Sequence, residues 1–388
     1  MIKSIWINNF KSLVDFELEL SKFTCLVGLN GAGKSTVLQA MDFISQLMLG
    51  DLDEWLKLRH WDSADINSKL TKESNIEFKI ILDIPDFGEV VWGGSVNRTT
   101  LRCTQEKVSI DHTNYLKVED GHCILREYDS RNLSALEEKS LLEQFTIMFE
   151  YQGSILSQLK RTQAKGVLYS LKQSILDIHS LDLLSPELLR SQTKTANGQL
   201  GLGGQKLSAF IHESGTNVKD KLKNELAGVY RQLESIDTKS LRSGWKQLEI
   251  TERYGDQKLK TAARHMNDGM LRLMAVLAQL ESGSEFLLFD EIENGINPEL
   301  IEYLIDQLVN ANNQIMVTTH SPMILNFMED VDAKKGVVYL YKTDQGFTKA
   351  KRLFDIPSMA KKLEFMGPGE VFIDTDLTHL FKEIATLQ

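Results

Sequence analysis

Hydrophobic and polar residues alternate at the start of the chain, which is the pattern of half-buried β-strands. The alternation predicts strands over residues 2–8 and 14–20, and a short apolar run predicts a third strand over 24–27. Apolar residues then recur at three- and four-residue spacing from 34 to 48, which predicts a helix. Short alternating runs separated by Gly, Asn and Asp fill residues 75–130 and predict antiparallel strands.

The pattern changes in the middle of the chain. Apolar residues are spaced as in helices from 134 to 184 and from 206 to 235, with a glycine-rich loop over 191–205. Beyond this region, helix and strand patterns alternate, as helix 270–281, strand 286–289, helix 298–310 and strand 314–318. Such alternation predicts right-handed βαβ units and a parallel sheet.

Together these patterns predict an α/β fold, in which a mixed sheet with a parallel core carries an antiparallel β subdomain. We expect an N-terminal lobe over residues 1–133, a helical insertion or lid over 134–259, and a C-terminal lobe over 260–388. The motifs described next fall in both lobes.

A glycine-rich loop follows the third predicted strand. Residues 28–35, GLNGAGKS, match the phosphate-binding pattern G-x-x-x-x-G-K-[ST] between a strand and a helix. The backbone N–H groups of such a loop and the helix N-terminus favour phosphate oxygens. We expect Lys34 to reach the β- and γ-phosphates of ATP and Ser35 to bind Mg²⁺. The nucleotide contacts would come from Asn30, Gly31, Ala32, Gly33, Lys34, Ser35 and Thr36.

Two carboxylates end the apolar strand predicted over 286–289. Asp290 and Glu291 there form a Walker B arrangement, in which a buried strand delivers acids at its C-terminal end. Asp290 would hold Mg²⁺, and Glu291 would orient and deprotonate the attacking water. The alternative, an acidic cap on a following helix, is weakened by the phosphate-binding loop elsewhere in the chain.

The two motifs lie far apart, since 256 positions separate Lys34 from Asp290. In this spacing the chain resembles the ABC class of ATPases, which carry a signature motif before the Walker B carboxylates. The resemblance implies that Asn267, Asp268 and Gly269 contact a nucleotide held by the opposite subunit. The Asn267 amide would replace a serine hydroxyl as donor. An ordinary helix N-cap is the alternative, and the two roles are compatible.

The same resemblance implies a switch histidine after the strand predicted over 314–318. His320 occupies that place and would touch the γ-phosphate, although a structural histidine is the alternative. Residues 293–298, ENGINP, correspond to the loop through which such subunits communicate, and Asn294-Gly295 alone would also form a turn.

With these motifs in order, the chain resembles the RecF/SMC/OLD-like group of ABC-class ATPases. The segments INNFKSL (7–13) and DEIENGINP (290–298) are also typical of that group, which includes proteins of bacterial anti-phage defence and DNA repair. The resemblance implies ATP and Mg²⁺ as cofactors, a homodimer that closes around ATP, and a separate nuclease-like effector protein. A nucleotide-binding subunit of a membrane transporter is the alternative, and a scaffold without hydrolysis is a third option.

Composition limits these functions. The chain has 388 residues and a net charge of −10, which excludes a generally basic surface for nucleic acid. Its three cysteines lack the spacing of a disulfide framework or a zinc site. We find no signal-peptide core and no membrane-spanning apolar run, and we therefore expect a cytoplasmic protein without membrane contact. Asp374 and Asp376 form a D-x-D pattern, which we interpret as a solvated turn rather than a nuclease metal site.

The charge is unevenly distributed. Residues 151–272 contain 19 Lys and Arg but 12 Asp and Glu, which makes this segment +7 and the remainder −17. Chance segregation on solvated helices would explain this. We expect instead that the insertion offers a mildly basic face to DNA or an acidic partner through Lys219, Lys221, Lys223, Arg231, Lys239 and Arg242.

Overall fold

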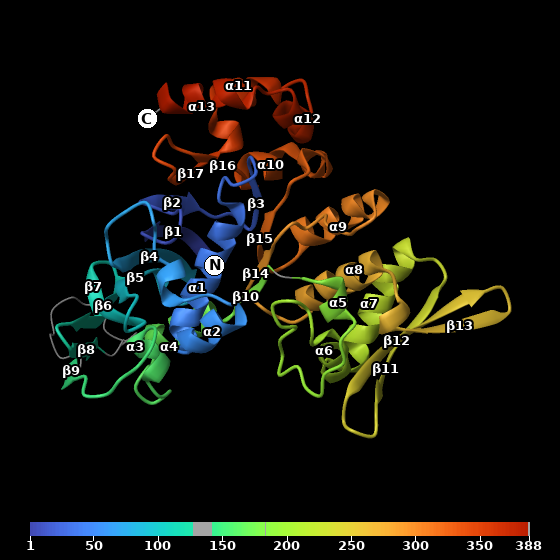
Figure 1. Ribbon diagram of the computed structural model, residues 1–388, viewed down its shortest axis with the longest axis horizontal. Helices are drawn as coiled ribbons and strands as arrows, with labels where there is room; N and C mark the ends of the chain where they lie inside the picture. Colours follow the sequence, from blue (N-terminus) through green and yellow to red (C-terminus); the bar gives the residue numbers. More distant parts are fainter. Residues whose placement is uncertain (127–141, 183, 387–388) are drawn as a thin grey trace. The chain divides into compact units, whose positions relative to one another are not determined.

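A computed structural model describes residues 1–126, 142–182 and 184–386. The chain divides into two compact units, each built from segments distant in sequence (Figure 1). The first unit contains Met1–His179 and Val338–Leu353, and the second contains Ser180–Val337 and Phe354–Gln388. The expected boundary at 133/134 lies outside the described residues, and the three expected segments remain a prediction.

An antiparallel sheet of eight strands dominates the first unit, in the order β2-β1-β4-β5-β6-β7-β8-β9. This confirms the prediction of antiparallel strands over 75–130. The strands are β1 (Ile2–Asn8), β2 (Phe16–Glu19), β4 (Asn75–Ile84), β5 (Gly88–Asn97), β6 (Arg102–Ile110), β7 (Thr113–Glu119), β8 (His122–Arg126) and β9 (Leu142–Thr146).

One face of this sheet is apolar and forms the core of the first unit. In β4, every second residue from Ile76 to Ile84 is buried, because side chains alternate between the faces of a strand. Trp92 on β5 is fully buried and meets the ring of Phe78 edge-on, with the ring centroids 4.7 Å apart. The helices of the unit are α1 (Lys34–Leu49), α2 (Leu52–Leu58), α3 (Ile155–Gln158) and α4 (Val167–Leu176).

A buried carboxylate ties β6 to the segment before α3. Glu106 is 2% exposed and accepts hydrogen bonds from Trp92 Nε1 and the Ile155 amide, both at 2.9 Å, and from the Ser154 hydroxyl. Burial raises the pKa of Glu106 above its usual value, although these three donors act in the opposite direction. This group therefore makes a polar crosslink inside an apolar core.

Three further strands of the first unit lie beside one another in the order β3-β16-β17. They are β3 (Phe23–Val27), β16 (Val337–Lys342) and β17 (Thr348–Arg352). The hairpin of β16 and β17 pairs Leu340 with Ala350. This hairpin is far from the phosphate-binding loop in the sequence, although it packs against that loop in the structure.

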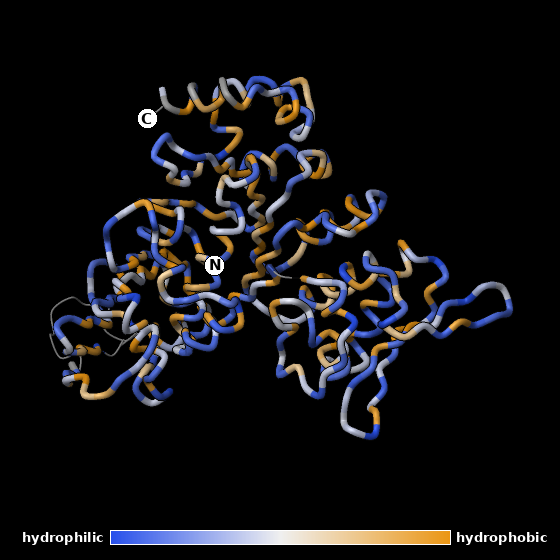
Figure 2. Tube along the Cα trace, viewed as in Figure 1, coloured by the Kyte–Doolittle hydropathy of each residue, from blue (hydrophilic) through white to orange (hydrophobic). Residues whose placement is uncertain are grey.

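The second unit contains the predicted βαβ pattern. Strands β14 (Phe286–Phe289) and β15 (Gln314–Thr318) are parallel, with Leu287 opposite Ile315. Every residue of both strands is buried, and Figure 2 shows their hydrophobic character. Helices α8 (Asp268–Leu280) and α9 (Pro298–Asn310) accompany them, which confirms the predicted order.

The inserted region is not wholly helical, and that prediction was wrong in part. Helices α5 (Pro186–Leu189), α6 (Leu207–Glu213) and α7 (Gly215–Val229) follow the short strand β10 (Ile178–Leu181). They are followed by an antiparallel sheet of β11 (Leu233–Ser240), β12 (Lys246–Tyr254) and β13 (Gln257–Ala262). These strands carry few buried residues, so their sequence shows little alternation. The glycine-rich stretch 191–205 is a loop, as predicted.

The end of the chain is helical, with α10 (Asp330–Gly336), α11 (Pro357–Lys362), α12 (Pro368–Ile373) and α13 (Leu377–Thr386). The D-x-D pattern follows α12, where Asp374 pairs with Lys362 Nζ at 3.0 Å. That ion pair favours a structural role for Asp374. Among the described residues, no helix combines the length and hydropathy needed to cross a membrane.

Candidate functional site

The phosphate-binding loop joins β3 to α1 and has two glycines that no other residue could replace without strain. Gly33, before the first residue of α1, has φ of 109°, in a region that L-residues rarely adopt. A Cβ at Gly33 would lie 2.4 Å from Thr348 Oγ1, and one at Gly28 would lie 2.4 Å from the Leu340 carbonyl oxygen. The β16–β17 hairpin therefore packs directly against the loop.

Thr348 on β17 fixes the loop through its side chain. Its hydroxyl lies 2.9 Å from the Ala32 carbonyl oxygen, to which it donates, and 2.8 Å from the Ser12 hydroxyl. Its amide donates to the Ser12 carbonyl at 2.9 Å. Because Thr348 is fully buried, these bonds are shielded from water and hold the loop in one conformation.

Lys34 places its charge inside the loop. The residue is 4% exposed, and Nζ donates to the carbonyl oxygens of Gly28 at 2.9 Å and Leu29 at 3.4 Å. Ser35 and Thr36 are half-buried in the first turn of α1, whereas Asn30 and Gly31 are exposed at the loop. The predicted phosphate-binding residues thus lie together, with an ammonium group and a helix N-terminus at one point.

The carboxylates of the second unit follow β14. Glu291 has φ of 47°, and its amide donates to the Thr318 hydroxyl at 2.9 Å. That hydroxyl in turn donates to a carboxylate oxygen of Asp290. Thr318 is the last residue of β15 and is fully buried, so it connects both acids to the neighbouring strand.

The structure brings the predicted base and switch residues together. A Glu291 carboxylate oxygen lies 3.2 Å from His320 Nε2, and the other accepts from Asn294 Nδ2 at 3.1 Å. The side chains of Glu291 and His320 are 43% and 40% exposed, so both can reach a water molecule and a ligand. A carboxylate and an imidazole are side chains that commonly act as general bases toward water.

Glu293 was not singled out from the sequence, yet it holds the histidine loop. Its Oε1 accepts from the amides of His320 at 2.7 Å and Ser321 at 3.1 Å. The sequence around Ile292 gave no sign of this role, because the partners are backbone amides in the segment that follows β15, far away in the sequence. Glu293 therefore positions His320 without touching its ring.

The signature residues begin α8. Asn267 Oδ1 accepts from the Met270 amide at 2.7 Å, so the N-cap role weighed as an alternative is present. The cap uses the amide oxygen, and the Asn267 NH₂ group is a separate donor. Asp268 pairs with Arg190, whose guanidinium also donates to the Met266 carbonyl at 2.8 Å.

Arg272 links this helix to the loop behind the carboxylates. One guanidinium nitrogen donates to the Asn294 carbonyl and another to the Leu184 carbonyl, both at 2.7 Å. Burial lowers the pKa of Arg272, while the charges of Glu291, Asp268 and Glu293 act against this shift. A Cβ on Gly269 would lie 3.1 Å from the Gly295 carbonyl oxygen, so the helix start and the loop are also in close contact.

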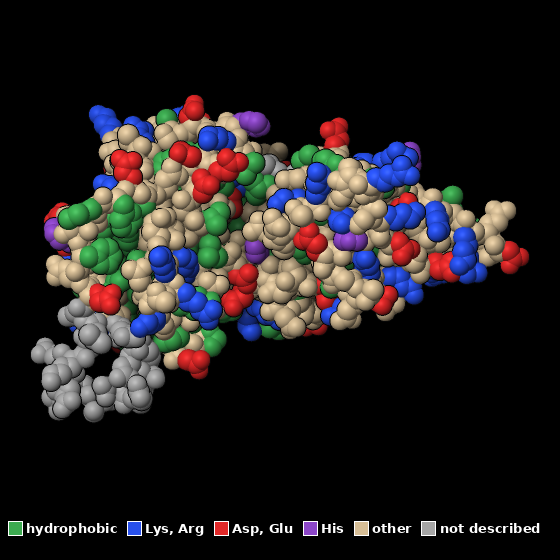
Figure 3. Space-filling model, turned by 90° about the horizontal axis from the view of Figure 1, so that it is seen from below, with side chains coloured by type: hydrophobic (Ala, Val, Ile, Leu, Met, Phe, Trp, Pro, Cys, Tyr) green, Lys and Arg blue, Asp and Glu red, His purple; other side chains and the backbone are tan. Residues whose placement is uncertain are grey.

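The expected basic face is partly neutralised. Lys219 donates to Thr238, Lys221 pairs with Glu281 at 2.6 Å, and Lys239 pairs with Glu249. At the right end of Figure 3, Lys and Arg side chains alternate with Asp and Glu. Lys223 is half-buried and Arg231 and Arg242 are exposed, so the structure does not gather the six residues into a uniformly basic surface.

Other predicted features can be compared directly. Cys25, Cys103 and Cys123 are all buried. Within the described parts of the chain, no three His, Cys, Asp or Glu side chains cluster as a metal site would require. The predicted ligands of Mg²⁺ are the Ser35 hydroxyl and the Asp290 carboxylate. Both are oxygen donors, which is the type of ligand that Mg²⁺ prefers.

Comparisons with known proteins define the class. Residues 1–87 match the family model "AAA ATPase domain", and residues 158–326 match "AAA domain, putative AbiEii toxin, Type IV TA system". The chain is 25% identical over 344 residues to the "OLD nuclease" of Thermus scotoductus, which covers 83% of this chain and 59% of that protein. It therefore spans less than two thirds of this relative.

Two solved structures show the same fold. One is an SMC head bound to the C-terminal winged-helix domain of ScpA, with a TM-score of 0.53, 16% identity, and coverage of 90% of this chain and 97% of that one. The other is an SMC head with an extended coiled coil, bound to the C-terminal domain of ScpA derived from Pyrococcus furiosus. It has a TM-score of 0.53 and 14% identity, with coverage of 94% and 99%.

The fold and its motifs define a P-loop ATPase with the architecture of an SMC head. Together with the similarity to the OLD nuclease, these matches support the resemblance to an ABC-like P-loop ATPase of the RecF/SMC/OLD group that the sequence predicted.

Proposed function

We propose that this ATPase is a molecular switch that dimerises around ATP and Mg²⁺ and controls a separate effector. The observation that carries the proposal is the network of Asp290, Thr318, Glu291 and His320, which accompanies a complete phosphate-binding loop elsewhere in the chain. Such a network is built for hydrolysis, because a carboxylate and an imidazole lie within hydrogen-bond distance where water can enter.

The residues have distinct proposed roles. Lys34 binds the β- and γ-phosphates, and the backbone of residues 30–36 surrounds them. Ser35 and Asp290 supply oxygen ligands to Mg²⁺, which neutralises charge on the phosphates when bound. Glu291 orients the attacking water and accepts its proton, and His320 contacts the γ-phosphate.

The proposed dimer explains the signature residues. Asn267, Asp268 and Gly269 of one subunit would contact the nucleotide held by Lys34 of the other. The exposed positions of Asn267 and Asp268 support this, since a second chain can reach them. The γ-phosphate would then join two subunits through charge-assisted hydrogen bonds, and its loss on hydrolysis would release them.

The proposed effector is a nuclease acting in anti-phage defence or DNA repair. The support is the similarity to an OLD nuclease over 59% of that protein's length. The SMC heads in the two solved structures are described as bound to ScpA domains, which supports the proposal of a partner for this chain. The transporter alternative receives no support from these relatives.

The test is the Glu291→Gln variant, which keeps the shape of the side chain but cannot accept a proton. We expect ATP turnover to fall by about 10²–10⁴-fold, the usual range for loss of a general base, while ATP binding persists. The variant should accumulate as an ATP-bound dimer, measured by light scattering after size-exclusion chromatography with ATP and Mg²⁺.

Glu299→Gln is the matched control, since Glu299 is an exposed carboxylate at the start of α9. Lys34→Ala should lose nucleotide binding and dimerisation together. A Glu291→Gln protein that binds ATP but stays monomeric would disprove the dimer, and one with normal turnover would disprove the role of Glu291.

A further inference from the structure

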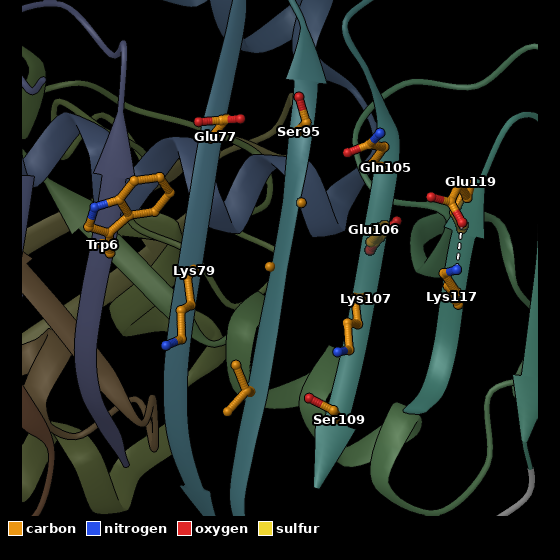
Figure 4. Close-up of a pocket in the computed structure, with 14 residues that line it drawn as sticks. Trp6, Glu77, Lys79, Ser95, Gln105, Glu106, Lys107, Ser109, Lys117 and Glu119 are labelled. Carbon is orange, nitrogen blue, oxygen red and sulfur yellow. Dashed lines mark ion pairs between the residues drawn. The ribbon is translucent and has the colours of Figure 1, made fainter. Parts of the chain in front are cut away.

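The solvent-facing side of the eight-stranded sheet contains a hollow of about 500 Å³. It lies across β1, β4, β5, β6 and β7 of the first unit, as Figure 4 shows, and none of its residues belongs to the nucleotide motifs. The side chains that line it are mostly charged or polar, although the opposite face of the same sheet forms an apolar core.

Strand register places three lysines and a tryptophan in one line across this hollow. Trp6 is opposite Lys79, Lys79 is opposite Gly93, Gly93 is opposite Lys107, and Lys107 is opposite Lys117. We call these five residues the lysine row. Four strand spacings separate its ends, so the row is about 19 Å long.

Gly93 opens the middle of the row. It has no side chain, and its neighbours on both sides are lysines, whose Cα atoms lie two strand spacings or about 10 Å apart. A Cβ there would meet the Phe78 carbonyl oxygen at 2.8 Å, so the position is closed to larger residues. No side chain of residue 93 therefore covers the backbone between Lys79 and Lys107.

The lysines are poorly compensated by their surroundings. Lys79 and Lys107 are exposed and form no ion pair within the described part of the chain, whereas Lys117 pairs with Glu119 at 2.5 Å. Like charges directly opposite each other on neighbouring strands destabilise a sheet, and Lys107 faces Lys117 in this way. A bound anion would relieve that repulsion.

Three acidic residues border the row. Glu77 accepts from Asn8 Nδ2 at 3.3 Å, Glu119 pairs with Lys117, and Glu17 on β2 is opposite Trp6 at the end of the row. The Trp6 indole N–H donates to Asp15 at 2.9 Å, which fixes the ring next to Lys79. Figure 4 shows the indole and the lysine side chains on the same side of the sheet.

We propose that the lysine row binds single-stranded nucleic acid through its phosphate backbone, with Trp6 contacting a base. A basic groove combined with an aromatic platform is the usual chemistry of single-strand binding without sequence preference. The tryptophan favours a nucleic acid over an acidic protein segment, since a polyglutamate chain has no ring to stack. This binding does not require ATP, so its test is independent of the proposed function.

The experiment measures fluorescence anisotropy of a labelled 20-residue oligothymidylate with the full chain, without nucleotide, over a series of salt concentrations. Lys79→Gln/Lys107→Gln should bind at least tenfold more weakly. Its salt slope should fall by about 1.4, because each phosphate contact with a single strand contributes about 0.7. Trp6→Leu should weaken binding severalfold and leave the salt slope unchanged.

Two controls separate charge from position. Lys22→Gln/Lys57→Gln removes the same charge from exposed positions of the first unit outside the row and should bind normally. Lys79→Arg/Lys107→Arg should retain affinity, because both cations are kept. Absence of binding, equal loss in the control, equal or tighter binding of a 20-base-pair duplex, or equal affinity for a polyglutamate peptide would each overturn the proposal.

Discussion

At the scale of single residues, Thr318 connects the two carboxylates on which hydrolysis would depend. Its hydroxyl accepts a hydrogen bond from the Glu291 amide and donates one to Asp290. These two bonds fix the direction in which the hydroxyl proton points. The left-handed backbone at Glu291 makes this support necessary, because a non-glycine residue with positive φ is otherwise disfavoured. Thr318 thus supports both carboxylates from the neighbouring strand.

Thr318→Val should reduce ATP turnover by about 10–100-fold, since the hydroxyl is lost while the volume is kept. A buried amide would also lose its acceptor, which costs about 1–3 kcal/mol of stability. Turnover under saturating ATP and thermal unfolding measure the two effects. Thr318→Ser keeps the hydroxyl and should remain close to the natural protein. Equal activity of the Val and Ser variants would refute this role.

The sequence led to proposed roles only for residues that lie in recognisable local motifs. Lys34, Asp290, Glu291 and His320 all fall within short runs whose neighbours identify them, and the structure places Glu291 beside His320. Thr318, Glu293 and Thr348 could not be found in this way, because each acts through backbone groups distant in sequence. A threonine at the end of a strand gives no separate signal.

At the scale of secondary-structure elements, Arg272 connects helix α8 to the loop after β14. The guanidinium reaches two carbonyl groups, Asn294 in the loop and Leu184 before α5. It is 9% exposed, and its planar fork fits two acceptors at once. A contact made at the start of α8 would therefore be transmitted to the segment that carries Glu291.

Arg272→Lys should lower ATP turnover by about tenfold and leave nucleotide binding by Lys34 unchanged. A lysine keeps the charge but cannot bridge both carbonyls, so the loop loses one anchor. Nucleotide affinity from titration calorimetry and turnover from phosphate release separate the two steps. Arg264→Lys is the matched control, since Arg264 is exposed. Parallel losses of affinity and turnover would contradict a coupling role.

The elements that the sequence predicted well are those with a strong hydrophobic period. Strand β14 is completely apolar and β15 has an apolar centre, α8 is buried over most of its length, and α9 buries one face, so all four were found within a few residues. The sheet of β11, β12 and β13 was missed because much of its surface is exposed and its pattern is weak. Strand β9 was read as helix, because Phe145 and Phe149 happen to recur at helical spacing.

At the scale of the whole molecule, the buried Glu106 makes stability depend on pH. Burial raises its pKa in the folded state, so the folded protein binds this proton more tightly than the unfolded chain. Between the unfolded value of about 4.3 and the raised value, the free energy of unfolding must decrease as pH rises. The stability is lost as pH rises above the ordinary carboxyl pKa. A salt-bridged acid behaves in the opposite way, because its contribution to stability is lost as pH falls.

Glu106→Gln should remove this slope, because an amide does not titrate. Denaturant unfolding at intervals from pH 5 to pH 8 measures it, and the comparison rests on slopes, since the amide also changes the hydrogen bonds around Ser154 and Trp92. Glu143→Gln, at an exposed position on β9, is the control and should leave the slope in place. Identical slopes in all three proteins would contradict the expectation.

The hairpin of β16 and β17 has a consequence for synthesis of the chain. The phosphate-binding loop is complete in sequence at Ser35, but Thr348, which fixes Ala32, lies 316 positions beyond that residue. Contacts of such sequence separation form late, since the intervening chain must first be ordered. On the ribosome, a nascent chain would therefore carry a loop that Thr348 does not yet fix until the β16–β17 hairpin has emerged. Nascent chains that have not reached the hairpin would thus bind ATP poorly, which would keep them out of a dimer.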